Sequence, residues 1–128
     1  MVELAIVLPI LLIVLFAIGE ISIALYDKAV LTNASREGTR AGIVAQTPRV
    51  TDAAIRQVVR DYATAYLITF GSAILGNADI LITRAGSTFG SNLTVSVNYR
   101  YDYLVLSRLI NALIGPITLN ATTVMKLE

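Results

Sequence analysis

Residues 2–26 form one long apolar stretch. No residue between Glu3 and Glu20 is charged, and the apolar character continues to Tyr26, interrupted at Glu20 and Ser22. About 20 such residues in a helix cross a hydrocarbon core of about 30 Å. Because the apolar positions lie on every side of the helix, they do not define one face that a single domain could cover. The pattern predicts a helix that is held in a membrane or in another apolar environment outside its own domain.

From Asp27 the pattern becomes amphipathic without a helix breaker. Small and apolar residues recur at three- and four-residue spacing, so the same helix is predicted to continue to about Gln46, before Thr47-Pro48. A helix over residues 1–46 is nearly 70 Å long at the standard rise, so it must protrude from its own domain. The amphipathic half, residues 27–46, carries small residues that let another backbone come close: Ala34, Gly38, Ala41 and Gly42.

The remainder, residues 47–128, reads as a globular head. Its first element is a second helix that starts at Thr47-Pro48 or at Thr51-Asp52, both of which are reasonable cap and first-turn signals. This helix carries an apolar stripe at helical spacing, which consists of Ile55, Val58, Val59, Tyr62, Tyr66 and Thr69 or Phe70.

From Ala78 the period changes to two, which is typical of strands. Strands are predicted at 79–85, 92–103 and 117–127, with a turn at 86–91 and a short helix or wide connection at 104–114. The middle strand alternates polar residues with an apolar set that we expect to be buried: Leu93, Val95, Val97, Tyr99, Tyr101 and Tyr103. The predicted fold is α+β: a long protruding N-terminal hydrophobic helix, with a second helix packed on a three-stranded antiparallel sheet.

Composition and motifs restrict the chemistry. The chain has no cysteine or histidine and a net charge of +1, which argues against the usual zinc sites, thiol chemistry, histidine-based catalysis and nucleic-acid binding. No glycine-rich loop joins a strand to a helix, so no phosphate cradle is predicted. We expect no enzymatic activity, cofactor or metal. Three N-x-S/T sequons, which matter only if the host glycosylates surface proteins, begin at Asn33, Asn92 and Asn120.

Two features do not belong in a plain membrane anchor. Glu3 lies at the entrance of the apolar stretch, where a carboxylate in lipid costs a few kcal/mol unless it is paired, and Pro9 removes a helix hydrogen bond. For a lone helix a simpler interpretation is equally good: Glu3 stays among the headgroups and the membrane tolerates Pro9. Further along, Arg36, Glu37 and Arg40 are most simply a solvated ladder with an intrahelical or intersubunit ion pair.

The stretch VELAIVLPILLIVLFAIGEISIALYDKAVLTNASREGTRAG resembles the opening of TadE-like proteins, the pilins and pseudopilins of tight-adherence (type IVc) pilus systems. The C-terminal half fits the family more loosely. The matching positions are Val2, Glu3, Leu8, Pro9, Glu20, Asn33, Ala34, Arg36, Glu37, Gly38 and Arg40. The resemblance implies an inner-membrane prepilin with a type IV pilin-like fold, which a dedicated peptidase processes and an ATPase-driven machine assembles. It also implies that Glu3 pairs with the N-terminal amine of a neighbouring subunit, although in the family this glutamate usually falls fifth after cleavage and here it is third.

The functional hypothesis is a structural pilin that leaves the inner membrane and polymerises with copies of itself into an extracellular filament. Its partners would be the bilayer before assembly, the assembly platform, the ATPase and the prepilin peptidase. The predicted assembly residues are Glu3, Pro9, Glu20, Ala34, Arg36, Glu37, Gly38, Arg40 and Gly42. Two alternatives stay open: a minor pseudopilin or tip initiator, which copy number would distinguish, and a single-pass membrane protein with a small binding domain, which would be monomeric in detergent.

Overall fold

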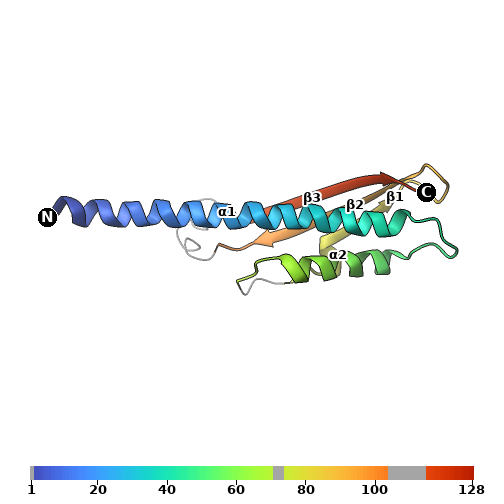
Figure 1. Cartoon of the computed structure of the whole chain (residues 1–128), viewed down its shortest axis with the longest axis horizontal. Coiled ribbons are helices and arrows are strands. Elements are labelled where there is room, and N and C mark those ends of the chain that lie inside the picture. Colours follow the sequence, from blue (N-terminus) through green and yellow to red (C-terminus); the bar gives the residue numbers. More distant parts are fainter. Residues whose placement is uncertain (1, 71–73, 104–114) are drawn as a thin grey trace.

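The computed structural model describes residues 2–70, 74–103 and 115–128. Its main feature is α1 (Val2–Ile43), one continuous helix that passes through Pro9 and whose N-terminal half extends away from the head (Figure 1). The helix ends before the predicted Gln46. The carbonyl oxygen of Ile43 accepts a hydrogen bond from the backbone N–H of Glu128 at 3.1 Å. A carbonyl that a further helical turn would have satisfied is therefore satisfied by the last residue of the chain.

The second helix, α2 (Asp52–Tyr66), starts at the later of the two predicted positions. Thr51 is its N-cap, and the Thr51 side chain accepts a hydrogen bond from the backbone N–H of Ala54 at 3.3 Å. The predicted stripe is right at Ile55 and Val59, which are buried, with Ala63 one turn further on. Val58 and Tyr62 are partly buried.

The last positions of the stripe are wrong. Tyr66 and Phe70 are 53% and 47% exposed, and Thr69 is exposed as well. For Thr69 and Phe70 the reason is that α2 ends at Tyr66, so the helical period no longer places the residues after it on the buried face. Tyr66 is the last residue of α2, and its ring lies beside that of Tyr62, with 4.8 Å between the ring centroids, rather than in the core.

After the short 3₁₀ helix η1 (Asn77–Asp79), the chain forms three strands: β1 (Ile80–Arg84), β2 (Asn92–Tyr101) and β3 (Ile117–Lys126). The sheet is antiparallel with the order β1-β2-β3. Each strand lies within its predicted range. β1 is shorter by one residue at both ends, whereas β2 and β3 begin where predicted and end two residues and one residue early. Asp79, predicted as the first strand residue, belongs to η1 because its carboxylate accepts a hydrogen bond from the backbone N–H of Gly76 at 2.8 Å. The predicted connection at 104–114 lies outside the described residues.

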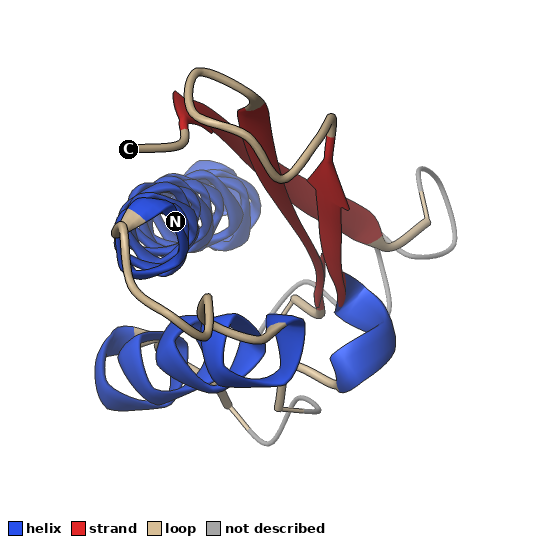
Figure 2. Ribbon diagram, turned by 90° about the vertical axis from the view of Figure 1, so that its right-hand side faces the viewer, coloured by secondary structure: helices blue, strands red, loops and turns tan. Residues whose placement is uncertain are grey.

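The head has two layers. Figure 2 shows both helices on one face of the sheet, where the C-terminal half of α1 packs on β2 and β3 and α2 approaches β1. All of the predicted inward side chains of the middle strand are buried, including Tyr103 just beyond its end: Leu93, Val95, Val97, Tyr99, Tyr101 and Tyr103. The opposite face carries polar pairs such as Ser96 and Thr122, whose hydroxyl oxygens are 2.9 Å apart. The predicted α+β architecture is confirmed.

Candidate functional site

The N-terminal half of α1 presents apolar side chains on every face. Every large apolar side chain from Leu4 to Ile18 is exposed, with fractions between 43% for Leu12 and 70% for Leu4. Surface of this extent is not stable in water, and a span of about 20 residues suits a bilayer. In the described part of the chain, α1 is the one helix that is long and apolar enough to cross a membrane.

Glu3 and Pro9 both lie on this exposed half. Glu3 is in the first turn of α1, at the end of the helix furthest from the head (Figure 1), and its side chain is exposed. The partial positive charge of a helix N-terminus favours a carboxylate at this position. Pro9 is also exposed, inside the helix. Both residues are therefore accessible to a neighbouring molecule.

Glu20 has the opposite environment, since only 4% of it is exposed. It lies where the head first covers α1. Two residues earlier, Ile18 is still 59% exposed. At Glu20, the hydroxyl of Tyr101 donates to the backbone carbonyl oxygen at 3.5 Å. Burial raises the pKa of the Tyr101 hydroxyl, and the Glu20 carboxylate adds to this rise because it disfavours a second negative charge nearby. The assembly role predicted for Glu20 thus lacks an exposed surface, and the residue marks the junction of helix and head.

The small residues of α1 are used inside the chain. Ala34, Gly38 and Gly42 are all buried. A Cβ atom at Gly42 would lie 2.5 Å from Cδ1 of Ile55 and 2.6 Å from Cδ2 of Leu93, and one at Gly38 would overlap Cγ2 of Val59. The predicted close approach of another backbone is therefore that of the chain's own α2 and β2. An intersubunit role for these three residues finds no exposed surface.

The charged cluster Arg36, Glu37 and Arg40 lies on the outer side of α1, where all three side chains are exposed. Among the described residues the ion pairs are Arg84–Asp52 and Arg100–Asp102. The cluster therefore makes no intrahelical ion pair in that part of the chain. The other alternative, an ion pair with a neighbouring subunit, stays a prediction.

Sequence reasoning missed Asp27, the first charged residue after the apolar stretch. It is fully buried, and its Oδ1 accepts a hydrogen bond from the backbone N–H of Ile68 at 3.0 Å. This bond ties the segment that follows α2 to α1. The only local signal was its position directly after the apolar stretch, inside the same helix, and its partner Ile68 is distant in sequence.

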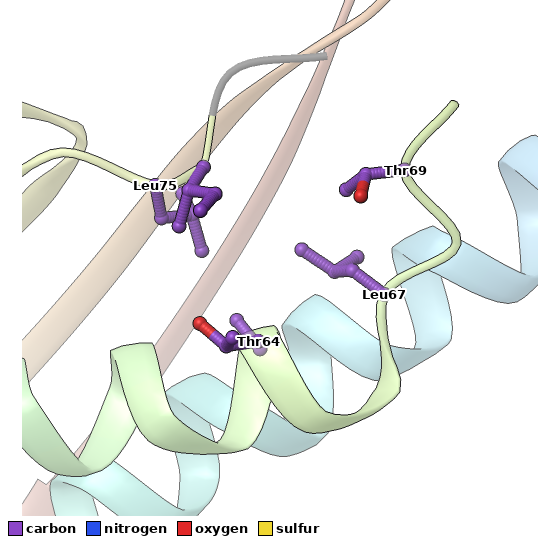
Figure 3. Close-up of a pocket in the computed structure, with 6 residues that line it drawn as sticks. Thr64, Leu67, Thr69 and Leu75 are labelled. Atoms are coloured by element: carbon purple, nitrogen blue, oxygen red, sulfur yellow. The ribbon is translucent and has the colours of Figure 1, made fainter. Parts of the chain in front are cut away.

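One small cavity lies between the end of α2 and the segment before η1. It measures about 90 Å³ and is lined by Ala63, Thr64, Leu67, Thr69, Ile74 and Leu75. Figure 3 shows the hydroxyl groups of Thr64 and Thr69 among apolar side chains. A cavity of this size is well below the roughly 300 Å³ at which small-molecule sites begin.

An exposed membrane-length helix joined to a two-layer α+β head defines a membrane-anchored protein of type IV pilin-like architecture. Residues 1–40 match the family of TadE-like proteins, which confirms the resemblance seen in the sequence. The match covers 40 of the 128 residues and associates this N-terminal part of the chain with tight-adherence pili. No curated protein and no solved structure matches the chain.

Proposed function

We propose that the chain is a structural subunit that polymerises through α1 into a tight-adherence pilus filament. The exposed apolar half of α1 carries this proposal. Twelve large apolar side chains between Leu4 and Ile18 are exposed. Removing such half-exposed side chains from water contributes about 1 kcal/mol each, so the full set contributes on the order of 10 kcal/mol. The TadE-like match over residues 1–40 includes this same segment.

The bilayer and the filament core are similarly apolar environments for the helix. Lipid tails are about as apolar as leucine side chains, so exchanging lipid for neighbouring helices changes little in hydrophobic energy. Packing and polar contacts between helices then decide whether a subunit stays in the inner membrane or enters an extracellular filament. In this proposal the partners are further copies of the chain, together with an assembly platform, an ATPase and a prepilin peptidase.

We assign to Glu3 the role of fixing the register between the α1 helices of neighbouring subunits. A carboxylate held among apolar helices costs a few kcal/mol unless a cation offsets it. The N-terminal amine of a neighbouring subunit supplies that cation, and this pairing fixes how far one helix is displaced along the next. Pro9 removes one hydrogen bond of the helix, which lets α1 bend or extend during the transfer. Arg36, Glu37 and Arg40 offer exposed charges for contacts between subunits.

Glu3→Gln and Glu3→Ala test this assignment, with Glu128→Gln as the control, because Glu128 is an exposed carboxyl residue at the other end of the chain. Loss of a pairing worth about 1.4 kcal/mol lowers an association constant tenfold, so we expect a filament yield about tenfold below the control. The membrane fraction should retain both Glu3 variants. The readout is the quantity of this chain in sheared fibres, checked by cryo-electron microscopy and N-terminal mass spectrometry.

Normal filaments from both Glu3 variants would remove Glu3 from the mechanism. The same fibres distinguish the alternatives. A trace amount of the chain at fibre ends would identify a minor or tip subunit, whereas a chain that is absent from fibres and monomeric in detergent would be a single-pass membrane protein.

A further inference from the structure

The segment that follows α2 exposes several large apolar side chains. Tyr66, Ile68, Phe70 and Ile74 are 53%, 39%, 47% and 65% exposed. We call these four residues the apolar rim. Residues 66–78 contain no charged residue, so this segment itself brings no charge that would have to be desolvated if the apolar rim met an apolar phase.

The apolar rim lies at the end of the head from which the exposed half of α1 emerges. The backbone N–H of Ile68 donates to Asp27, one residue after the apolar stretch ends at Tyr26. Figure 1 shows the chain that leaves α2 at this end of the head, and the C-terminus and the turn between β1 and β2 at the opposite end.

The dimensions of a bilayer place this end in the headgroup layer. A hydrocarbon core of about 30 Å that begins at Leu4 ends about 20 residues later, near Ile23. The edge of the head that covers Glu20, with the Tyr101 hydroxyl, then dips about 5 Å below this level. Asp27 and the attached Ile68 then lie about 6 Å beyond it, within the polar layer that adds about 5–8 Å on each side. Leu25 and Tyr26 of α1 are 64% and 45% exposed at the same level, so α1 also presents apolar surface at this depth.

We propose that the apolar rim is a second membrane contact, which rests in the headgroup layer of the bilayer while α1 spans it. Aromatic side chains with an apolar body and a polar tip, such as Tyr66, are favoured at this depth. The contact fixes the tilt of the head over the membrane, and a subunit that leaves the bilayer must release the rim as well as α1. This inference rests on the part of the proposed function that inserts α1 into a membrane.

The chain has no tryptophan, so a single introduced tryptophan reports its surroundings without background. Phe70→Trp supplies a rim reporter. Phe89→Trp supplies a turn reporter as the matched control, because Phe89 is 85% exposed in the turn between β1 and β2 at the far end of the head. Phe16→Trp supplies a helix reporter, which shows whether α1 is inserted. Each full-length variant is reconstituted into phosphatidylcholine–phosphatidylglycerol vesicles, and quenching is measured with lipids that carry a nitroxide near the headgroup and with iodide in the water.

We expect the shallow nitroxide lipid to quench the rim reporter several-fold more strongly than the turn reporter. Iodide should quench the turn reporter several-fold more strongly than the rim reporter. Equal quenching of these two reporters would overturn the second contact. Tyr66→Trp, at the last residue of α2, repeats the measurement should the change at Phe70 disturb folding.

Two further outcomes distinguish a failure of the rim contact from a failure of the membrane insertion of α1. If nitroxides deep in the bilayer do not quench the helix reporter, α1 is not inserted, and the proposed function loses its basis together with the rim contact. The second outcome is that lipid quenches the helix reporter, while the rim reporter is shielded from iodide but not quenched by lipid. If this shielding grows with protein density, then a second copy of the chain covers the rim. That result would overturn the lipid contact and leave insertion intact.

Discussion

The two halves of α1 invert the usual relation between polarity and burial. In residues 4–19 the large apolar side chains are exposed, whereas in residues 20–43 several polar side chains are buried: Glu20, Asp27, Ser35 and Thr39. In the second half, each hydroxyl is compensated. Ser35 Oγ donates to the carbonyl oxygen of Thr32 at 2.8 Å, and Thr39 Oγ1 donates to that of Ser35 at 2.6 Å. The first half has no buried hydroxyl groups that need hydrogen-bond partners, because its apolar surface is compatible with lipid or neighbouring helices.

This comparison shows that the two halves of one helix are adapted to different environments. The first half is stabilised by an apolar phase outside the chain, and the second half by contacts with α2 and the sheet. Substitutions of the same type in the two halves should therefore have different effects on the stability of the head. That stability can be followed in detergent by chemical denaturation with the near-ultraviolet circular dichroism of the tyrosines.

The largest difference is expected for leucine. Leu31 is fully buried in the core, whereas Leu11 is 59% exposed. Leu31→Ala should lower the free energy of unfolding of the head by about 2–5 kcal/mol, because it removes buried atoms and leaves a cavity. Leu11→Ala should leave it unchanged. Equal losses from the two variants would show that the halves are not energetically separate.

A smaller difference is expected for glycine. Gly42→Ala adds a Cβ that meets Ile55 and Leu93 at 2.5–2.6 Å, whereas no atom lies within 4 Å of a Cβ added at Gly19. Overpacking of this kind costs about 1–3 kcal/mol. The denaturation midpoint should therefore fall for Gly42→Ala and stay constant for Gly19→Ala. A midpoint for Gly42→Ala equal to that of the unchanged chain would mean that the side chains of Ile55 and Leu93 move aside without cost.

The smallest difference is expected for serine. Ser35 Oγ lies 2.6 Å from the hydroxyl of Thr123 on β3, whereas Ser22 Oγ is exposed and donates to its own helix at the carbonyl oxygen of Ile18, at 2.8 Å. Ser35→Ala should cost about 1 kcal/mol in head stability, since it removes a hydrogen bond and leaves Thr123 with fewer partners. Ser22→Ala should have no measurable effect. A cost for Ser22→Ala as large as that for Ser35→Ala would contradict this assignment.

Local pattern was sufficient for much of the fold. The alternation from Leu93 to Tyr103 correctly predicted the buried face of the middle strand, and the Thr51-Asp52 signal correctly predicted one of two possible helix starts. Both depend on residues that are neighbours in sequence. The same approach failed for Phe70, because the predicted stripe continues past the end of α2, and for Tyr66, which is the last residue of that helix and is nevertheless exposed.

The candidate site was predicted less completely. Position in the sequence indicated Glu3 and Pro9, which the structure leaves exposed, and their role in assembly stays a prediction. The same reasoning grouped Glu20, Gly38 and Gly42 with them as assembly residues. Spacing indicates that small residues allow close packing, but not whether the partner is another subunit or the chain's own α2.

By itself, the sequence determined that this protein has a membrane-length apolar stretch with a TadE-like beginning, and a head in which helical and strand periods follow each other. These properties depend only on residues that are close to one another in the sequence. The tertiary structure decided which polar residues of α1 are covered, where α1 ends and where the apolar rim lies. The physical reason is that these outcomes depend on partners far along the chain: Ile68 for Asp27, Thr123 for Ser35 and Glu128 for Ile43.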